Sequence, residues 1–128
     1  MRLAVFLIGF ALACCGCTRT GPTMAGGQSV AHWVQKLQSA DPKTRRHAIE
    51  KLGNVGPENP AILPALRDAL ADRDPQVRAE AIVALMKCGK AASEAVPTLY
   101  ELHTKDSSPL VREYASKALA KLNGDVKN

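Results

Sequence analysis

Apolar residues recur at intervals of three and four along the chain from Gln28 onward, which is the pattern of helices that bury one face. Prolines, glycines and short polar stretches interrupt this pattern at regular intervals and mark where one helix ends and the next begins. The sequence therefore predicts an all-α domain. The expected helices cover residues 28–39, 43–55, 60–71, 76–88, 93–104 and 110–122.

One motif occurs three times, at the start of the second, fourth and sixth expected helices. The copies read DPKTRRHAIEKL (41–52), DPQVRAEAIVAL (74–85) and SPLVREYASKAL (108–119). Each begins with a residue that can cap a helix, followed by a proline that suits the first helical turn. The helices are expected to end at the equivalent residues Gly56, Gly89 and Asn123, and Gly53 is assigned to a helix end as well.

Apolar positions align within the three copies and again within the helices between them. Ala48 corresponds to Ala81 and Ala115, and in the other set Trp33 corresponds to Leu66 and Leu99. The repeating unit is therefore a pair of helices about thirty-three residues long. One pair alone cannot bury its apolar stripe, so such units stack.

This pattern resembles the HEAT repeat, in the short form shared with bilin-lyase-like proteins. The resemblance covers residues 28–123 and is best in the second copy, whereas the first has Thr44 and Lys51 and the third has Ser108 and Asn123 at departures from the pattern. It implies a right-handed α-solenoid of three HEAT-like helix pairs, six helices in all, with a short tail after them. The expected pairs are 28–56, 59–89 and 93–123, and the tail is 124–128.

The repeated charged residues are expected to be structural. Asp41 and Arg45, like Asp74 and Arg78, are four residues apart and can form ion pairs along one helix. In the family that the chain resembles, the arginine helps to hold neighbouring repeats in register, a role that extends to Arg112.

The N-terminal segment 1–17 is expected to be an export signal. Arg2 precedes an uncharged apolar run from Leu3 to Ala13, which as a helix of roughly 16 Å is too short for a membrane core of about 30 Å. Ala11-Leu12-Ala13 fits ordinary signal cleavage, whereas the cysteines that follow resemble the lipobox of bacterial lipoproteins. The candidates for lipid attachment are Cys14, Cys15 and Cys17. Residues 18–27 are interpreted as a flexible tether, and the chain is expected to be exported and lipid-anchored at the bacterial cell envelope, on a periplasmic or outer-membrane face.

The 128 residues suffice for one domain, and 17 Lys and Arg against 12 Asp and Glu favour acidic partners without selecting their class. No catalytic, cofactor-binding or metal-binding set emerges. His32, His47 and His103 lie singly in different helices and are expected at the surface or its boundary. Cys88 aligns with Val55 and Leu122 and is expected to be a small buried residue, as Trp33 is expected in the core or the N-terminal cap.

The binding surface is expected on the second helix of each pair, which in HEAT-like stacks lines the concave face. Positions on that helix that vary between the three copies are candidates for partner contacts, because the structural positions stay constant. An ordinary solvated face is the alternative. The candidates are Arg46, His47, Glu80, Val83, Lys87, Tyr114, Lys117 and Lys121.

These features predict a non-catalytic scaffold that binds a protein partner. The alternative is an intracellular accessory subunit of an enzyme complex of the bilin-lyase kind. Self-association is plausible because three repeats are near the lower limit for an independent stack. Nucleic-acid binding is disfavoured, since it requires a cytoplasmic location.

Overall fold

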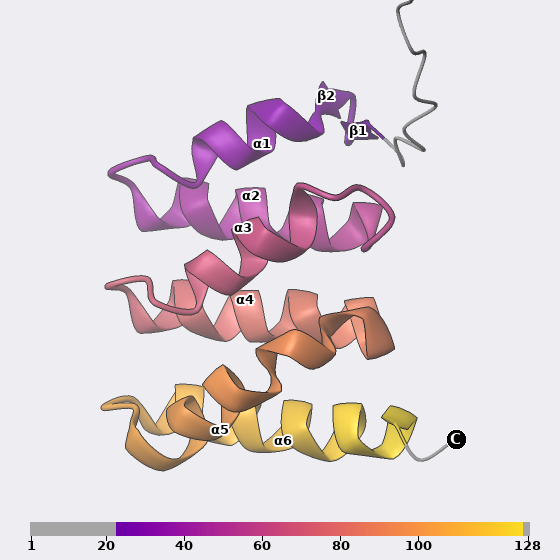
Figure 1. The fold of residues 1–128 in the computed structure, drawn as a ribbon. Coiled ribbons are helices and arrows are strands. Elements are labelled where there is room, and N and C mark those ends of the chain that lie inside the picture. Colours follow the sequence, from indigo (N-terminus) through magenta and orange to yellow (C-terminus); the bar gives the residue numbers. More distant parts are fainter. Residues whose placement is uncertain (1–22, 127–128) are drawn as a thin grey trace, which may run out of the picture.

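A computed structural model describes residues 23–126, with side chains through Gly124, and these residues form layers of helices stacked along one axis (Figure 1). The helices are α1 (Val30–Lys36), α2 (Pro42–Val55), α3 (Ile62–Ala69), α4 (Pro75–Cys88), α5 (Val96–Lys105) and α6 (Pro109–Val126). A 3-10 helix, η1 (Gly89–Ala95), leads into α5. The all-helical stack predicted from the sequence is present, with a small two-stranded sheet at its N-terminal end.

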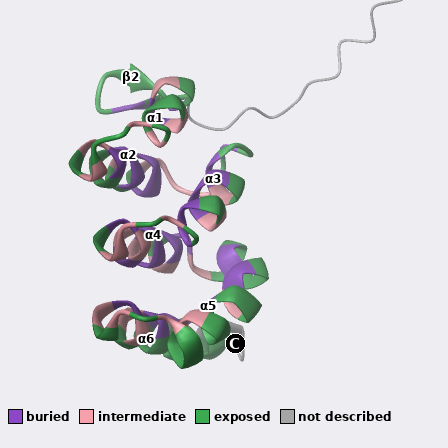
Figure 2. Cartoon of the chain, turned by 90° about the vertical axis from the view of Figure 1, so that its left-hand side faces the viewer, coloured by how far each residue is buried: buried purple, intermediate pink, exposed green. Residues whose placement is uncertain are grey.

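The second helices α2, α4 and α6 form one column, and α3 and α5 lie beside it (Figure 2). The residues that align between the motif copies line the core between the columns. Ala48, Ala81 and Ala115 are completely buried, as are Leu66 and Leu99 on the first helices. The small side chains of the three alanines let neighbouring helices come close, so each layer packs directly on the next.

Capping fixes where the second helices begin. The Asp41 carboxylate accepts hydrogen bonds from the backbone N–H groups of Lys43 and Thr44, and that of Asp74 accepts from Gln76 and Val77. Pro42 and Pro75 follow in the first turn, where no donor is needed. The predicted starts of α2 and α4 are therefore confirmed.

Two of the three predicted helix ends are confirmed. Gly56 and Gly89 adopt positive φ angles of 89° and 56°, which glycine reaches without the steric cost of a side chain. Asn123 was wrongly predicted to end the last helix, because α6 continues to Val126. Within the described residues no helix follows α6, so no turn begins at Asn123.

The first helices are shorter than predicted. Pro97 lies in the first turn of α5 and has no N–H for an α-helical bond backward, so the chain before it forms η1 instead. At the N-terminus, Gln28–Ser29 (β2) pairs antiparallel with Met24–Ala25 (β1), and the Ser29 hydroxyl accepts the backbone N–H of His32 at 3.1 Å. Helix α1 therefore starts at Val30.

The first strand and the turn of the hairpin lie inside segment 18–27, which was predicted to be a flexible tether, and the second strand replaces the predicted start of the first helix. Ala25 is buried, and its carbonyl accepts a hydrogen bond of 2.8 Å from Trp33 Nε1. Residues 24–27 are therefore an ordered cap on the first helix pair, held by the indole of Trp33. Residues 18–22 of that segment and the predicted signal with Cys14, Cys15 and Cys17 lie outside the described residues.

Candidate protein-binding surface

The repeated arginines join consecutive helix pairs. Arg45 on α2 donates to the carboxylate of Asp72, which lies after α3, through Nε at 2.8 Å and Nη2 at 2.9 Å. Arg78 on α4 makes the same two-pronged contact with Asp106 at 2.9 and 2.8 Å. The register role implied by the family resemblance is therefore present in the structure for these two arginines.

The predicted ion pairs within one helix are wrong. Asp41 and Asp74 are occupied as helix caps, and the arginine four residues later turns instead to the following helix pair. An aspartate at the cap accepts N–H groups of its own first turn, which positions its carboxylate away from the arginine. Asp72 and Asp106 were missed, although their equal spacing before Asp74 and Ser108 is a repeat signal visible in the sequence.

Burial and the arginines act in opposite directions on the pKa values of the two carboxylates. Burial alone would raise the pKa of Asp72, but the hydrogen bond from Arg45, the backbone N–H of Asp74 and the arginine charge lower it below the ordinary 3.8. The pKa of Asp106 is lowered in the same way against its burial, by Arg78 and the N–H of Ser108. Both groups are therefore held as anions at neutral pH.

The candidate partner-binding positions lie on the second helices as expected, but they differ in exposure. Arg46, His47, Lys87, Lys117 and Lys121 are exposed, whereas Glu80, Val83 and Tyr114 are half-buried. We call these eight positions on α2, α4 and α6 the second-helix face.

Several of these side chains are already engaged with neighbours. Lys87 Nζ donates to Asn54 Oδ1 of the preceding pair at 3.0 Å, and Lys117 Nζ donates to Glu113 at 2.6 Å. The same ammonium group lies 5.4 Å from the centroid of the Tyr114 ring. The carboxylate of Glu113 holds the pKa of Lys117 above its ordinary value, so this lysine stays charged. The C-terminal part of the face thus presents an aromatic ring beside a positive charge.

The histidines and the cysteine of the described chain lie where the sequence suggested. His47 and His103 are exposed and His32 is half-buried, while the rings of His32 and His47 both contact Trp33 edge to face. Cys88 is buried, and desolvation raises the pKa of its thiol. Among the side chains described, those of residues 23–124, no group of three His, Cys, Asp or Glu could hold a metal ion.

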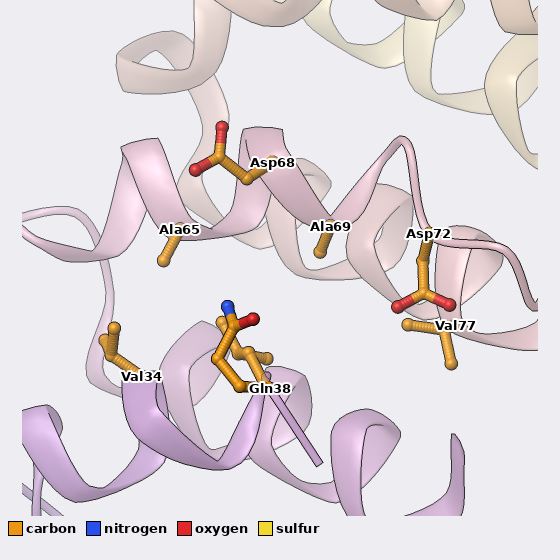
Figure 3. A pocket seen from close by; sticks show the side chains of 8 residues that line it. Val34, Gln38, Ala65, Asp68, Ala69, Asp72 and Val77 are labelled. Atoms are coloured by element: carbon orange, nitrogen blue, oxygen red, sulfur yellow. The ribbon is translucent and has the colours of Figure 1, made fainter. Parts of the chain in front are cut away.

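The opposite side carries two recesses around α1 and α3. One of about 230 Å³ is lined by Val34 and Gln38 from the α1 side and by Ala65, Asp68, Ala69 and Asp72 from the α3 side (Figure 3). In this view Asp68 points away from the hollow, and Asp72 is bound to Arg45. A second recess, of about 510 Å³, is lined mainly by apolar and uncharged side chains, including Val30, Val34 and Ala61. Neither recess brings a nucleophile together with a general base.

Stacked helix pairs joined by a repeated arginine contact define an α-solenoid protein. The sequence matches the HEAT repeats family over residues 30–120, and the chain belongs to that family. No curated protein matches the chain. HEAT repeats generally mediate protein–protein interactions on their extended surfaces, and they typically act as non-catalytic scaffolds. None of the helices in residues 23–126 is long and apolar enough to cross a membrane.

Proposed function

We propose that this chain is a non-catalytic scaffold that binds a protein partner through the second-helix face. The HEAT-repeat match over residues 30–120 is the observation that carries the proposal, because this architecture presents aligned helices as a preformed surface. Side chains on such a surface lose little conformational freedom on binding when they are already held by their neighbours, as Lys117 and Lys87 are.

The two ends of the face differ in chemistry. Arg46 and His47 lie exposed on α2, while Tyr114, Lys117 and Lys121 lie on α6. Tyrosine and arginine are favoured anchors at protein interfaces, and the excess of positive charge suits a partner with an acidic surface. The partner proposed here is therefore a protein with acidic patches that match both ends.

Substitution of this face tests its role. The triple variant Arg46→Ala, Tyr114→Ala and Lys117→Ala is compared with a control that changes Gln35, Asp68 and Glu101, which are exposed on the first helices. Proteins cross-linked to the wild-type chain and to the control, but not to the triple variant, are the expected partners. A partner that binds the triple variant with undiminished affinity would show that this face is not the binding surface. Circular dichroism verifies that both variants are folded.

We further propose that the chain is exported and lipid-anchored, on the basis of the apolar run from Leu3 to Ala13 and the cysteines after it. A membrane anchor would confine the scaffold to a surface and raise its effective concentration for partners there. The right-handed sense of the stack and the bilin-lyase-like form of its repeats stay predictions.

The intact mass of the native protein from a membrane fraction tests the anchor. The expected mass corresponds to a chain that starts at Cys14, Cys15 or Cys17 and carries a lipid, and serine substitutions at each cysteine identify the acceptor. An unprocessed chain in the soluble fraction contradicts export. It would favour the accessory-subunit alternative, which predicts co-purification with a catalytic chain.

A further inference from the structure

Each junction between helix pairs uses the same arrangement of arginine atoms. Nη1 of Arg45 donates to Ser39 O at 2.8 Å and Nη1 of Arg78 donates to Asp72 O at 2.8 Å, which anchors each guanidinium to its own pair. The remaining edge, Nε and Nη2, then faces the following pair and binds its carboxylate. A planar guanidinium fixed in this way recognises a carboxylate with two parallel bonds.

Arg112 on α6 has the anchor without the carboxylate. Its Nη1 donates to Asp106 O at 2.6 Å, as the equivalent atoms of Arg45 and Arg78 do to their own loops. Among the side chains of residues 23–124, no carboxylate meets its Nε or Nη2. The edge that joins one helix pair to the next is therefore oriented but open at the C-terminal end of the described stack.

Tyr100 on α5 lies at a position that, in the first and second helix pairs, faces the pair that follows. The equivalent residue of the first pair, Val34, lines the recess opposite Ala65 and Ala69 of α3 (Figure 3). In the second pair the equivalent Arg67 forms an ion pair with Glu94 of the next pair. In the third, 63% of the Tyr100 surface is exposed. The third pair thus exposes a large aromatic side chain at a position that contacts the following pair in the rest of the stack.

At this end of the stack, α6 exposes two small side chains, one of them polar. Ala120 is exposed at the position of Gly53, where α2 approaches α4 so closely that an added Cβ would lie 2.8 Å from Ala84 Cβ. Ser116 is exposed at the position of the buried residues Ile49 and Ile82. Small residues permit close helix packing, and the serine keeps the surface compatible with water when it is uncovered. We call Tyr100, Arg112, Ser116 and Ala120 the end face.

The opposite end of the stack is closed. Ser39 occupies the position of Asp72 and Asp106, and its hydroxyl accepts the backbone N–H of Asp41 at 3.2 Å, as those aspartates accept from their own loops. It supplies no carboxylate to an arginine. The hairpin also covers the first pair, with the Lys51 side chain against Gly26. A second copy placed head to tail would therefore offer serine to Arg112, which argues for a different chain as the partner.

We propose that the end face docks a helix pair of another protein, which presents an Asp or Glu carboxylate to Arg112 as Asp72 does to Arg45. The partner helix packs over Ser116 and Ala120, and an apolar side chain covers Tyr100. This surface is distinct from the second-helix face, so the scaffold has two separate docking sites. A partner on the end face extends the stack along its axis, whereas a partner on the second-helix face binds along its side.

The competence of the end face is tested with a probe taken from this chain. A copy of residues 57–89, which contains Asp72, is inserted between Asn123 and Gly124 of the full chain. The copied aspartate then follows Arg112 at the spacing that separates Arg45 from Asp72. The added pair is expected to be protected from amide hydrogen exchange. In this longer chain Arg112→Gln is expected to lower the melting temperature by about 5 °C, against about 1 °C in the natural chain.

An added pair without exchange protection, or an Arg112→Gln effect that is equal in both chains, overturns the proposal. The triple variant of the second-helix face is expected to leave the Arg112 effect in the longer chain unchanged. Failure of the two docking sites can therefore be distinguished.

The identity of the occupant is tested by a photo-reactive residue in place of Tyr100, in cells that naturally make the protein. The expected product joins this chain to a helix of another protein with an acidic residue in the loop after it, as Asp72 follows α3, and Arg112→Gln abolishes the product. Absence of any product overturns the proposal. So does a product between two copies of this chain, accompanied by a dimer in sedimentation that Arg112→Gln dissociates.

Discussion

Arg78 and Asp106 lie twenty-eight residues apart in the sequence, and their side chains meet through two hydrogen bonds of 2.9 and 2.8 Å. The side chains are only 12% and 5% exposed, so the pair lies largely out of solvent at the junction of α4 with the loop before α6. The equivalent contact between Arg45 and Asp72 joins the first helix pair to the second. These contacts connect consecutive helix pairs of the stack.

Removal of one partner is expected to destabilise the whole stack. Arg78→Ala leaves Asp106 largely buried without its counter-charge, and this should lower the free energy of unfolding by about 3 kcal/mol. Arg67→Ala is the matched control, because its ion pair with Glu94 is exposed and should contribute less than about 1 kcal/mol. Urea unfolding followed by circular dichroism measures both. Equal, small effects in the two variants would show that the buried junction does not stabilise the stack.

Gly53 is expected to tolerate no side chain, although it lies inside a helix. A Cβ there would lie 2.8 Å from Ala84 Cβ and 3.2 Å from Ala84 Cα, so α2 and α4 would have to separate. Gly53→Ala should therefore cost about 1–3 kcal/mol of stability, despite the better helix propensity of alanine. Gly124→Ala is the control, because a Cβ at that helical position meets nothing within 4 Å. It should be neutral or stabilising by up to about 1 kcal/mol. A Gly53→Ala protein as stable as the Gly124→Ala protein would contradict the close contact.

Trp33→Phe is expected to loosen the N-terminal hairpin. The phenyl ring can fill much of the buried space, but it cannot donate to Ala25 O, whose carbonyl would lose its 2.8 Å bond. A loss of about 1–2 kcal/mol follows from the unpaired acceptor and the smaller ring. Amide exchange should rise first in residues 24–30, while α4 and α6 stay protected. Uniform loss of protection along the chain would instead show that the hairpin and the stack unfold together.

The stability of the protein is expected to fall at acid pH because Asp72 and Asp106, the carboxylates between helix pairs, become protonated. The pKa values of Asp72 and Asp106 in the folded protein lie below the ordinary 3.8, so the folded state binds these protons less readily than the unfolded state. Their contribution is complete above about pH 4 and is lost as the pH falls through the lowered pKa values. Thermal unfolding at about pH 6 and pH 3 measures this loss. The Asp72→Asn, Asp106→Asn double variant should be less stable at pH 6 but should lose less on acidification. An unchanged acid dependence would assign it to other carboxylates, such as Asp41.

Much of the fold could be predicted because the same helix-forming motif occurs three times in the sequence. A capping residue, a proline and alanines at fixed spacing specify each second helix with little help from the rest of the chain, as the caps at Asp41 and Asp74 illustrate. The first helices were less predictable, since Pro97 and the Ser29 hydroxyl shift their starts by local chemistry that periodicity does not register. The hairpin escaped prediction because two-residue strands leave no alternating pattern.

The sequence by itself determined the helical stack, the helix-pair repeat and the burial of residues such as Ala81 and Cys88, since these follow from period and capping within each segment. Only the tertiary structure decided which charges meet. Arg45 is four residues from Asp41 in the chain but binds Asp72, because stacking brings the next loop to its side chain while the cap occupies the nearer carboxylate. The same stacking leaves Arg112 with an open edge. A local pattern specifies a helix, whereas a contact between layers depends on how those helices pack.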